Sequence, residues 1–207
     1  MKGYPNDLYI LAFDHRGTLT KGLLGVEGRQ PSEEEVARVS SMKDIIFDGF
    51  LEASSKGIEG GDPAILVDET FGLQVQNRAK DMGIKLAAPV EKSGQKIFDF
   101  EYGDNFGEKI KEVNADFVKI LVRWNPDDDS ETRQIQGERI KTLSDWLDEN
   151  ERKFLLEFLV PASEEQLASV GGDQSRYDSE IRPKLAVQVV EEMRERGADP
   201  DIWKIEG

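Results

Sequence analysis

Two residue types that supply much of enzyme chemistry are scarce here: the sequence has no cysteine, and His15 is its only histidine. Without cysteine the chain has no disulfide bond, no thiolate nucleophile and no thiolate metal site. A single histidine excludes zinc sites of the HExxH type and argues against a Ser-His-Asp triad. These absences remove the commonest thiol-based and histidine-based sites from consideration.

Basic charge and long apolar runs are also lacking. The 207 residues include 42 Asp or Glu and 27 Lys or Arg, which gives a net charge of −15. Such acidity argues against partners that need a basic face, namely nucleic acids and anionic membrane surfaces. No apolar run reaches membrane-spanning length, and residues 1–5 show no signal-peptide hydrophobic region. We therefore expect a soluble, cytoplasmic protein.

Short apolar runs alternate with amphipathic segments along the chain. The predicted strands are 8–13, 64–67, 84–90, 116–122, 153–160 and a last one around Lys204. The predicted helices are 33–56, 72–82, 104–113, 130–150 and 181–196, with loops over the rest. In the first helix we expect Ser32 as the N-cap and a core-facing set made of Val36, Val39, Ile45, Ile46, Phe50 and Leu51.

This alternation is typical of a parallel sheet covered by helices, and it favours a (β/α)8 barrel of the TIM type. Several predicted strands carry or end in charged residues at their C-terminal side, which is where such barrels hold their chemistry. A doubly wound sheet is the competing fold, but the chain has no Gly-rich phosphate turn after its first strand. We predict one barrel domain over residues 1–207.

The predicted barrel is incomplete, because a closed barrel needs eight strands and the pattern supplies six. Strands seven and eight are not present in this sequence. Chain outside these residues completes the barrel, or a loop hides an element that the pattern misses, or the chain is a fragment or an open partial barrel. An open barrel has exposed sheet edges, which need a partner to cover them.

Three predicted strands carry a charged residue inside an otherwise apolar run: Lys119, Glu157 and Lys204. Large apolar residues flank each of them, so strand alternation puts the three charges on one face of the sheet. With strands about 4.8 Å apart, the charges lie within about 5 to 10 Å of one another. The result is a partly compensated cluster of two lysines and one glutamate in a mostly apolar interior.

Such a cluster has a chemical use. A second ammonium lowers the pKa of a neighbouring lysine, and a neutral amine can attack a ketone to form a Schiff base. We expect Lys204 to be that amine, Lys119 the perturbing ammonium and Glu157 the base that accepts a substrate hydroxyl proton. Asp14, at the end of the first strand, binds hydroxyls or helps to dehydrate the carbinolamine. The alternative is a purely structural role, in which these charged groups only form ion pairs with one another.

Six motifs carry a family resemblance, and they occur at all six strand ends in order. They are Ala12–Gly17, Leu66–Gly72, Pro89–Gly94, Val118–Asn125, Phe154–Leu159 and Asp201–Glu206. Together they resemble the class I tagatose 1,6-bisphosphate aldolase family. More closely, they resemble the aldolase-like domain of bacterial myo-inositol catabolism, which occurs alone or fused to a sugar kinase.

The resemblance implies a (β/α)8 barrel and aldol cleavage without a metal or other cofactor. It places Lys204 at the Schiff-base lysine, Lys119 at the second active-site lysine, Glu157 at the acid/base glutamate and Asp14 in a catalytic acidic motif. As substrate-binding residues it implies Arg16, His15, Glu69, Lys92 and Arg123. His15 stands where the tagatose enzymes commonly carry glutamine, which bears on hydroxyl recognition. The inositol pathway suggests a phosphorylated 2-deoxy-5-keto-gluconate as substrate.

Three functions remain open at this point. The first is a class I aldolase that cleaves a phosphorylated ketose or keto-deoxy sugar acid. The second is a non-catalytic sugar-phosphate-binding or kinase-associated module. The third is a metal-dependent barrel enzyme that uses Asp14, Asp68, Glu69 and Glu91, because carboxylates alone can hold magnesium. The expected ligand is a small sugar phosphate, and the expected protein partner is a second copy of the chain or a sugar kinase.

Overall fold

Six parallel strands form one sheet in the computed structural model, which describes residues 2–57 and 60–206. The strands are β1 (Asp7–Ala12), β2 (Gly61–Leu66), β3 (Lys85–Pro89), β4 (Phe117–Arg123), β5 (Lys153–Leu159) and β6 (Ile202–Lys204). Each strand pairs in parallel with the next along the chain, in the order β1-β2-β3-β4-β5-β6. A doubly wound sheet reverses its order partway, so this competing fold is excluded. The predicted α/β class is confirmed.

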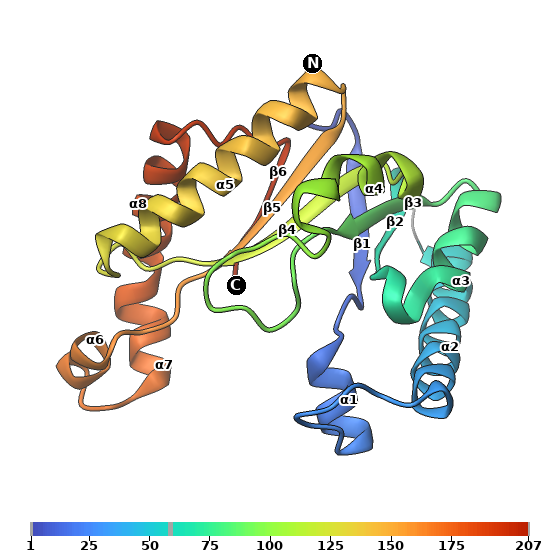
Figure 1. Cartoon of the computed structure of the whole chain (residues 1–207), viewed down its shortest axis with the longest axis horizontal. Coiled ribbons are helices and arrows are strands. Elements are labelled where there is room, and N and C mark those ends of the chain that lie inside the picture. Colours follow the sequence, from blue (N-terminus) through green and yellow to red (C-terminus); the bar gives the residue numbers. More distant parts are fainter. Residues whose placement is uncertain (1, 58–59, 207) are drawn as a thin grey trace.

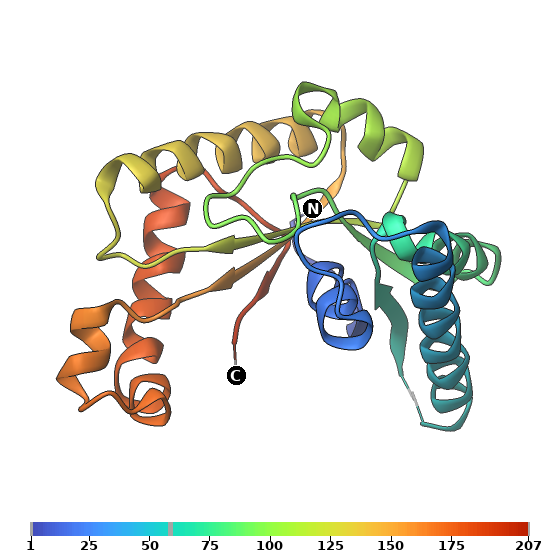
Figure 2. The same cartoon turned by 60° about the horizontal axis from the view of Figure 1, so that its bottom comes forward.

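The helices connect consecutive strands of a curled sheet, which has the shape of half a barrel (Figures 1 and 2). They are α1 (Gly17–Leu24), α2 (Glu33–Gly57), α3 (Glu69–Asp81), α4 (Phe106–Val113), α5 (Ser130–Glu149), α6 (Glu164–Ser169), α7 (Gln174–Arg176) and α8 (Arg182–Glu195). Most of them lie along the outer side of the sheet, whereas α1 lies beyond the C-terminal end of β1 (Figure 1). A 3₁₀ turn, η1 (Gly103–Asn105), precedes α4, and a π-helical turn, η2 (Tyr177–Ile181), precedes α8. In Figure 2, α5 and α8 cover one half of the sheet, and α2 and α3 cover the other.

The two faces of the sheet are filled differently. The outer face packs against the helices in two apolar clusters, for example Ile120 and Leu156 against Leu143 and Val189, because the βα connections bring the helices to that face. The inner face has a smaller cluster of Leu66, Ala87, Phe117 and Leu155, against which Tyr4, Leu8, Ile10, Ala12 and Ile202 pack. Above this cluster, toward the C-terminal ends of the strands, the inner face becomes polar.

Two parts of the predicted secondary structure were wrong. The segment after β1, predicted as a loop from its glycines and threonines, forms the eight-residue helix α1, which ends at Gly25 with φ of 64°. The polar segment after β5, also predicted as a loop, contains α6, whose first turn is closed by a capping box between Ser163 and Gln166. Local capping and tertiary contacts outweigh weak helix propensity in both segments.

The core-facing side of α2 was predicted only in part. Ser32 caps the helix as expected, because its hydroxyl accepts the Glu35 N–H at 3.2 Å. Ile45 and Ile46, however, are 70% and 37% exposed, although both were predicted to face the core. The buried positions are Val39, Lys43, Phe47 and Phe50, spaced four, four and three residues apart, as one face of a helix requires.

Candidate active site

Strand register brings Lys119, Glu157 and Lys204 to one place on the inner face. Glu157 pairs across β5 and β6 with Lys204, and it lies opposite Leu121, two residues beyond Lys119 on β4. Alternation keeps all three side chains on the face opposite the helices. The Glu157 carboxylate contacts both lysines: Oε2 lies 3.1 Å from Lys119 Nζ, and Oε1 accepts a hydrogen bond from Lys204 Nζ. The carboxylate therefore bridges the two amines.

Lys119 is buried within a shell of three carboxylates. Its Nζ donates to Asp14 Oδ2 at 2.7 Å and to Glu91 Oε1 at 2.9 Å, in addition to its ion pair with Glu157. An ammonium has three N–H donors, so this shell can use all of them. Burial alone would lower the pKa of Lys119, but the negative charges of Glu91, Asp14 and Glu157 outweigh burial and raise it above the ordinary value. Lys119 is held as a cation.

The carboxylates in this shell are not equivalent. Burial would raise the pKa of Asp14, but the Lys119 ammonium beside it lowers that pKa below the usual value. At Glu91 burial prevails and raises the pKa, although Lys119 and Arg16 oppose the shift. Glu91 Oε2 is buried and has no hydrogen-bond partner among the described residues. The shell thus combines a carboxyl group whose pKa is lowered with one whose pKa is raised.

Lys204 lies at the open edge of the sheet, on β6. Its side chain is 38% exposed, whereas that of Lys119 is 2% exposed. The difference follows from position, since Lys119 is on an inner strand and β6 has a neighbour on one side only among the described residues. Lys204 is the amine of this cluster that a molecule from solution can reach.

A cavity of about 250 Å³ opens over these groups at the C-terminal ends of the strands. Of the residues predicted from sequence to be catalytic or substrate-binding, all except Glu69 line it: Asp14, His15, Arg16, Lys92, Lys119, Arg123, Glu157 and Lys204. Glu91 lines it too, with Gly17 and Thr18 from the start of α1 and the segment Ser93–Gln95. The cavity walls thus offer several cations, several carboxylates and backbone groups to a small polar ligand.

The predicted substrate-binding residues make contacts of their own at the rim. Arg16 donates to the Glu91 carbonyl at 2.8 Å and lies 3.4 Å from a Glu101 carboxylate oxygen. Lys92 pairs with Asp99 at 3.0 Å, and Arg123 donates to the Gln95 carbonyl at 2.9 Å. These contacts fix the loops after β1, β3 and β4 around the opening.

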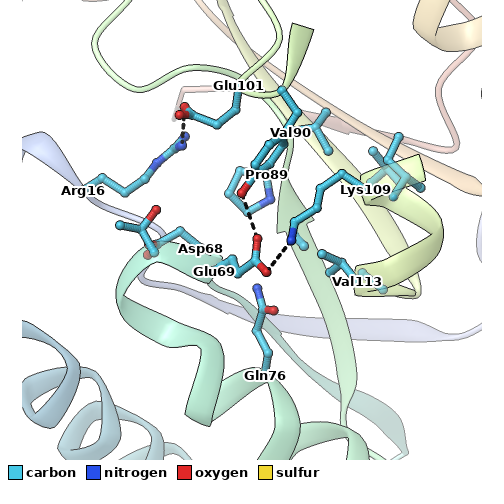
Figure 3. Close-up of a pocket in the computed structure, with 15 residues that line it drawn as sticks. Arg16, Asp68, Glu69, Gln76, Pro89, Val90, Glu101, Lys109 and Val113 are labelled. Atoms are coloured by element: carbon cyan, nitrogen blue, oxygen red, sulfur yellow. Dashed lines mark hydrogen bonds and ion pairs between the residues drawn. The ribbon is translucent and has the colours of Figure 1, made fainter. Parts of the chain in front are cut away.

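The structure does not bring Glu69 to this cavity. Glu69 begins α3, and its side chain lies between α3 and α4 on the outer side of β3 (Figure 3). It pairs with Lys109 at 2.7 Å and accepts the Tyr102 hydroxyl at 2.9 Å, in a void of about 20 Å³ with an apolar wall. Arg16 borders both spaces, but the ion pair of Glu69 belongs to the packing of α4.

Sequence reasoning missed a second buried lysine next to the site. Lys43 of α2 is fully buried, pairs with Asp68, and donates to the backbone carbonyls of Phe13 and His15 at 2.8 and 3.1 Å. A signal for it existed, because Lys43 stands four residues from both Val39 and Phe47 on the apolar face of its helix. Glu91 was considered only as a metal ligand.

The geometry gives little support to the metal-dependent interpretation. Asp68 is engaged by Lys43 and by the Phe71 N–H that it caps at 2.9 Å, and Glu69 is on the outer side of the sheet. Within residues 2–57 and 60–206, no group of three or more acidic or histidine side chains could hold a metal ion. In the same part of the chain, no helix is both long and apolar enough to cross a membrane.

Comparisons with known proteins agree with the resemblance seen in the motifs. A family model described as "Uncharacterized protein conserved in bacteria (DUF2090)" matches residues 2–207. The tagatose 1,6-diphosphate aldolases of Lactococcus lactis subsp. lactis and of Streptococcus pneumoniae serotype 4 are each 23% identical over 201 residues. The matches cover 95% of this chain and 56% of each aldolase, so the chain spans little more than half the length of these curated relatives.

Among solved structures, a protein from Corynebacterium glutamicum matches with a TM-score of 0.43 and 18% identity, over 72% of this chain and 47% of that one. The sequence matches confirm distant homology to tagatose 1,6-bisphosphate aldolases over most of the chain. A link to inositol catabolism stays a prediction.

Proposed function

The chain belongs to the DUF2090 family of proteins conserved in bacteria, and we propose that it acts as a sugar-phosphate aldolase that forms a Schiff base at Lys204. The observation that carries this proposal is the Glu157 carboxylate, which bridges a solvent-reachable amine and a buried ammonium in a cavity at the strand ends. The distant relatives named as aldolases support the same reaction class.

In the proposed reaction the neutral amine of Lys204 attacks the ketone carbon of the substrate and forms a carbinolamine. Loss of water gives an iminium ion, with one of the neighbouring carboxylic acids donating the proton that the departing hydroxyl needs. Glu157 then accepts the proton of the hydroxyl two carbons from the iminium carbon. The C–C bond breaks, the aldehyde leaves, and the bonding electrons move to the iminium, which becomes an enamine.

The second half of the reaction restores the amine. A proton adds to the enamine carbon and regenerates the iminium, and water attacks it to release the second product from Lys204. Lys119 remains a cation throughout, and it stabilises the negative charge of Glu157 and Asp14 between proton transfers. Arg16, His15, Lys92 and Arg123 form the proposed substrate-binding rim.

The proposed fold of the complete enzyme is a closed eight-stranded barrel over a single domain, of which the described residues form five βα units and a sixth strand. Apolar side chains at both open edges support this: Tyr9 and Leu11 on β1 are 47% and 38% exposed, and Ile205 after β6 is 59% exposed. Two further βα units would cover these positions. The cytoplasm is the proposed location.

The experiment is trapping with sodium borohydride in the presence of a candidate substrate, followed by mass spectrometry of peptides. Dihydroxyacetone phosphate, tagatose 1,6-bisphosphate and phosphorylated 2-deoxy-5-keto-gluconate are the probes; the last one tests the inositol context. We expect a reduced adduct on Lys204 in the wild-type chain. The Lys204→Ala variant should give none, whereas Lys184→Ala, at an exposed lysine of α8, should react like wild type.

Calorimetry with the same sugar phosphates separates the two main functions. Binding without an adduct or turnover would favour the non-catalytic module, which keeps the cations of the cavity for binding alone. An adduct on Lys204 accompanied by release of an aldehyde would support the aldolase. Full activity in Lys204→Ala would overturn the Schiff-base mechanism.

A further inference from the structure

The buried pair of Lys43 and Asp68 lies directly behind the wall of the cavity. Lys43 reaches from α2 to the end of β1, and its three N–H donors have three acceptors: the Phe13 carbonyl, the His15 carbonyl and the Asp68 carboxylate. The side chains of Lys43 and Asp68 are 0% and 1% exposed. Neither group lines the cavity, so neither can touch a substrate in this conformation.

The two carbonyls belong to the residues on either side of Asp14. An ammonium that binds both of them fixes the backbone on either side of Asp14, and with it the direction in which the Asp14 side chain leaves the backbone. That side chain is the one whose Oδ2 lies 2.7 Å from Lys119 Nζ. The geometry thus links α2 to the charge cluster through a single residue, Asp14, in the loop that follows β1.

The ion pair is poorly explained by stability alone. Removing two charges from water is costly, and a buried ion pair replaced by apolar residues of similar volume is often as stable or more stable. Directed hydrogen bonds to the Phe13 and His15 carbonyls are what an apolar side chain could not provide. Asp68 is fixed in turn, because it caps α3 through the Phe71 N–H.

We propose that Lys43 is a positioning residue: together with Asp68 it holds the Phe13–His15 segment so that the Asp14 carboxylate stays against Lys119. This inference rests on the proposed function only where it concerns catalysis, because the position of Asp14 can be measured without any substrate. Asp14 faces Lys119 on β4, and the charge of Lys204 on β6 also acts on it.

The direct test is the pKa of Asp14, measured by NMR titration of its side-chain carboxyl carbon. In the wild-type chain, Lys119 keeps this pKa below its usual value. The double variant Lys43→Met/Asp68→Asn removes one positive and one negative charge and leaves no unpaired ion buried. We expect the Asp14 pKa to rise toward the ordinary carboxyl value, because the carboxylate is no longer held at Lys119.

The matched control is Gln76→Met. Gln76 is buried on α3 and donates to the Val67 carbonyl at 3.0 Å, so its loss also frees a carbonyl at a strand end, next to Asp68, but removes no charge and no hydrogen bond to the Phe13–His15 segment. The Asp14 pKa should stay at its wild-type value in this variant. An unchanged Asp14 pKa in a folded double variant, or an equal rise in the Gln76 control, would overturn the positioning role.

Catalysis gives the second readout. If Lys43 acts through Asp14, the double variant should slow borohydride trapping at Lys204 by about ten- to a hundredfold, the scale of a misplaced catalytic group. In an Asp14→Asn background it should slow trapping less than about twofold, because the effects of coupled residues are not additive. Equal slowing in both backgrounds would contradict the proposal.

The outcomes separate the two proposals. A wild-type chain that shows no adduct on Lys204 refutes the aldolase, and the Asp14 titration then still decides on Lys43. If this double variant does not fold, Lys43→Leu/Asp68→Ser replaces it in the titration; it also removes one charge of each sign, and the Ser hydroxyl can still accept the Phe71 N–H. A rise of the Asp14 pKa in that variant supports the positioning role, and no rise refutes it.

Discussion

Lys43 and Lys119 are both completely buried, and each has three acceptors around its ammonium, yet their surroundings differ in charge. Lys119 has three carboxylates, which reverse the effect of burial and raise its pKa. Lys43 has one carboxylate and two neutral carbonyls; burial prevails there and lowers its pKa although Asp68 opposes the shift. The first environment has more negative than positive charge in direct contact, and the second is balanced.

This difference distinguishes the candidate active site around Lys119 from the structural ion pair of Lys43 and Asp68. The carboxylates around Lys119 line a cavity, one of them also contacts Lys204, and one has a buried oxygen without a partner among the described residues. Around Lys43 each N–H donor has an acceptor, and neither Lys43 nor Asp68 lines the cavity. Unequal protonation of neighbouring carboxylates is what acid–base chemistry uses, whereas a balanced buried pair fixes geometry.

The largest loss of stability is expected from Lys119→Met. It leaves Asp14, Glu91 and Glu157 close together without their shared cation, and an uncompensated buried charge costs about 3 to 5 kcal/mol. Urea unfolding at pH 7 should show this loss, and part of it should return near pH 5 as the carboxyl groups protonate. Lys141→Met, in an exposed pair with Asp145, should cost less than about 0.5 kcal/mol. A Lys119→Met chain as stable as wild type at pH 7 would remove the basis of the comparison.

A smaller loss of stability is expected at the charge-balanced pair of Lys43 and Asp68. Lys43→Met alone leaves the Asp68 carboxylate buried and should destabilise the chain by about 3 kcal/mol. Adding Asp68→Asn should recover most of this loss, since the remaining carboxamide can still accept the Phe71 N–H. A double-mutant cycle in urea measures the coupling, and simple additivity of the two changes would show that the pair does not act as a unit.

The sequence predicted the charge cluster because the rule behind it is local and strict. Alternation along a strand decides which face Lys119, Glu157 and Lys204 share, and parallel neighbours need no long-range information beyond strand order. The six strands were predicted from short apolar runs that alternate with amphipathic segments, and the structure has a strand at each of these places. The closed eight-stranded barrel stays a prediction.

The errors came from positions where tertiary contacts decide. Lys43 was overlooked because lysine is ordinarily exposed, and only Phe13, His15 and Asp68 from distant segments reveal why it is buried. Glu69 follows a strand end, as active-site residues do, but it lies in the first turn of α3, which directs its side chain to the outer side of the sheet. Distance along the chain from a strand end does not give the direction of a side chain.

The smallest changes in stability are expected from the carboxyl groups around Lys119, and they distinguish Asp14 from Glu91. Asp14 has a lowered pKa, so its stabilisation is present above its unfolded value of 3.8 and is lost as the pH falls through the folded value. Glu91 has a raised pKa, so the folded chain holds its proton more tightly, and stability increases as the pH falls from the folded value toward 4.5.

Asp14→Asn should therefore destabilise the chain at pH 7, whereas Glu91→Gln, which mimics the protonated acid, should leave it as stable or slightly more stable. Each change should lie within about 1.5 kcal/mol of wild type, the scale of one hydrogen bond. Urea unfolding from pH 7 to below pH 3.8 measures both: Glu91→Gln should approach wild type as the pH falls toward 4.5, whereas Asp14→Asn should approach it only below pH 3.8. The same sign for both variants at pH 7 would mean that the shell holds three equivalent anions, and the proton that the dehydration step requires would then have to come from elsewhere.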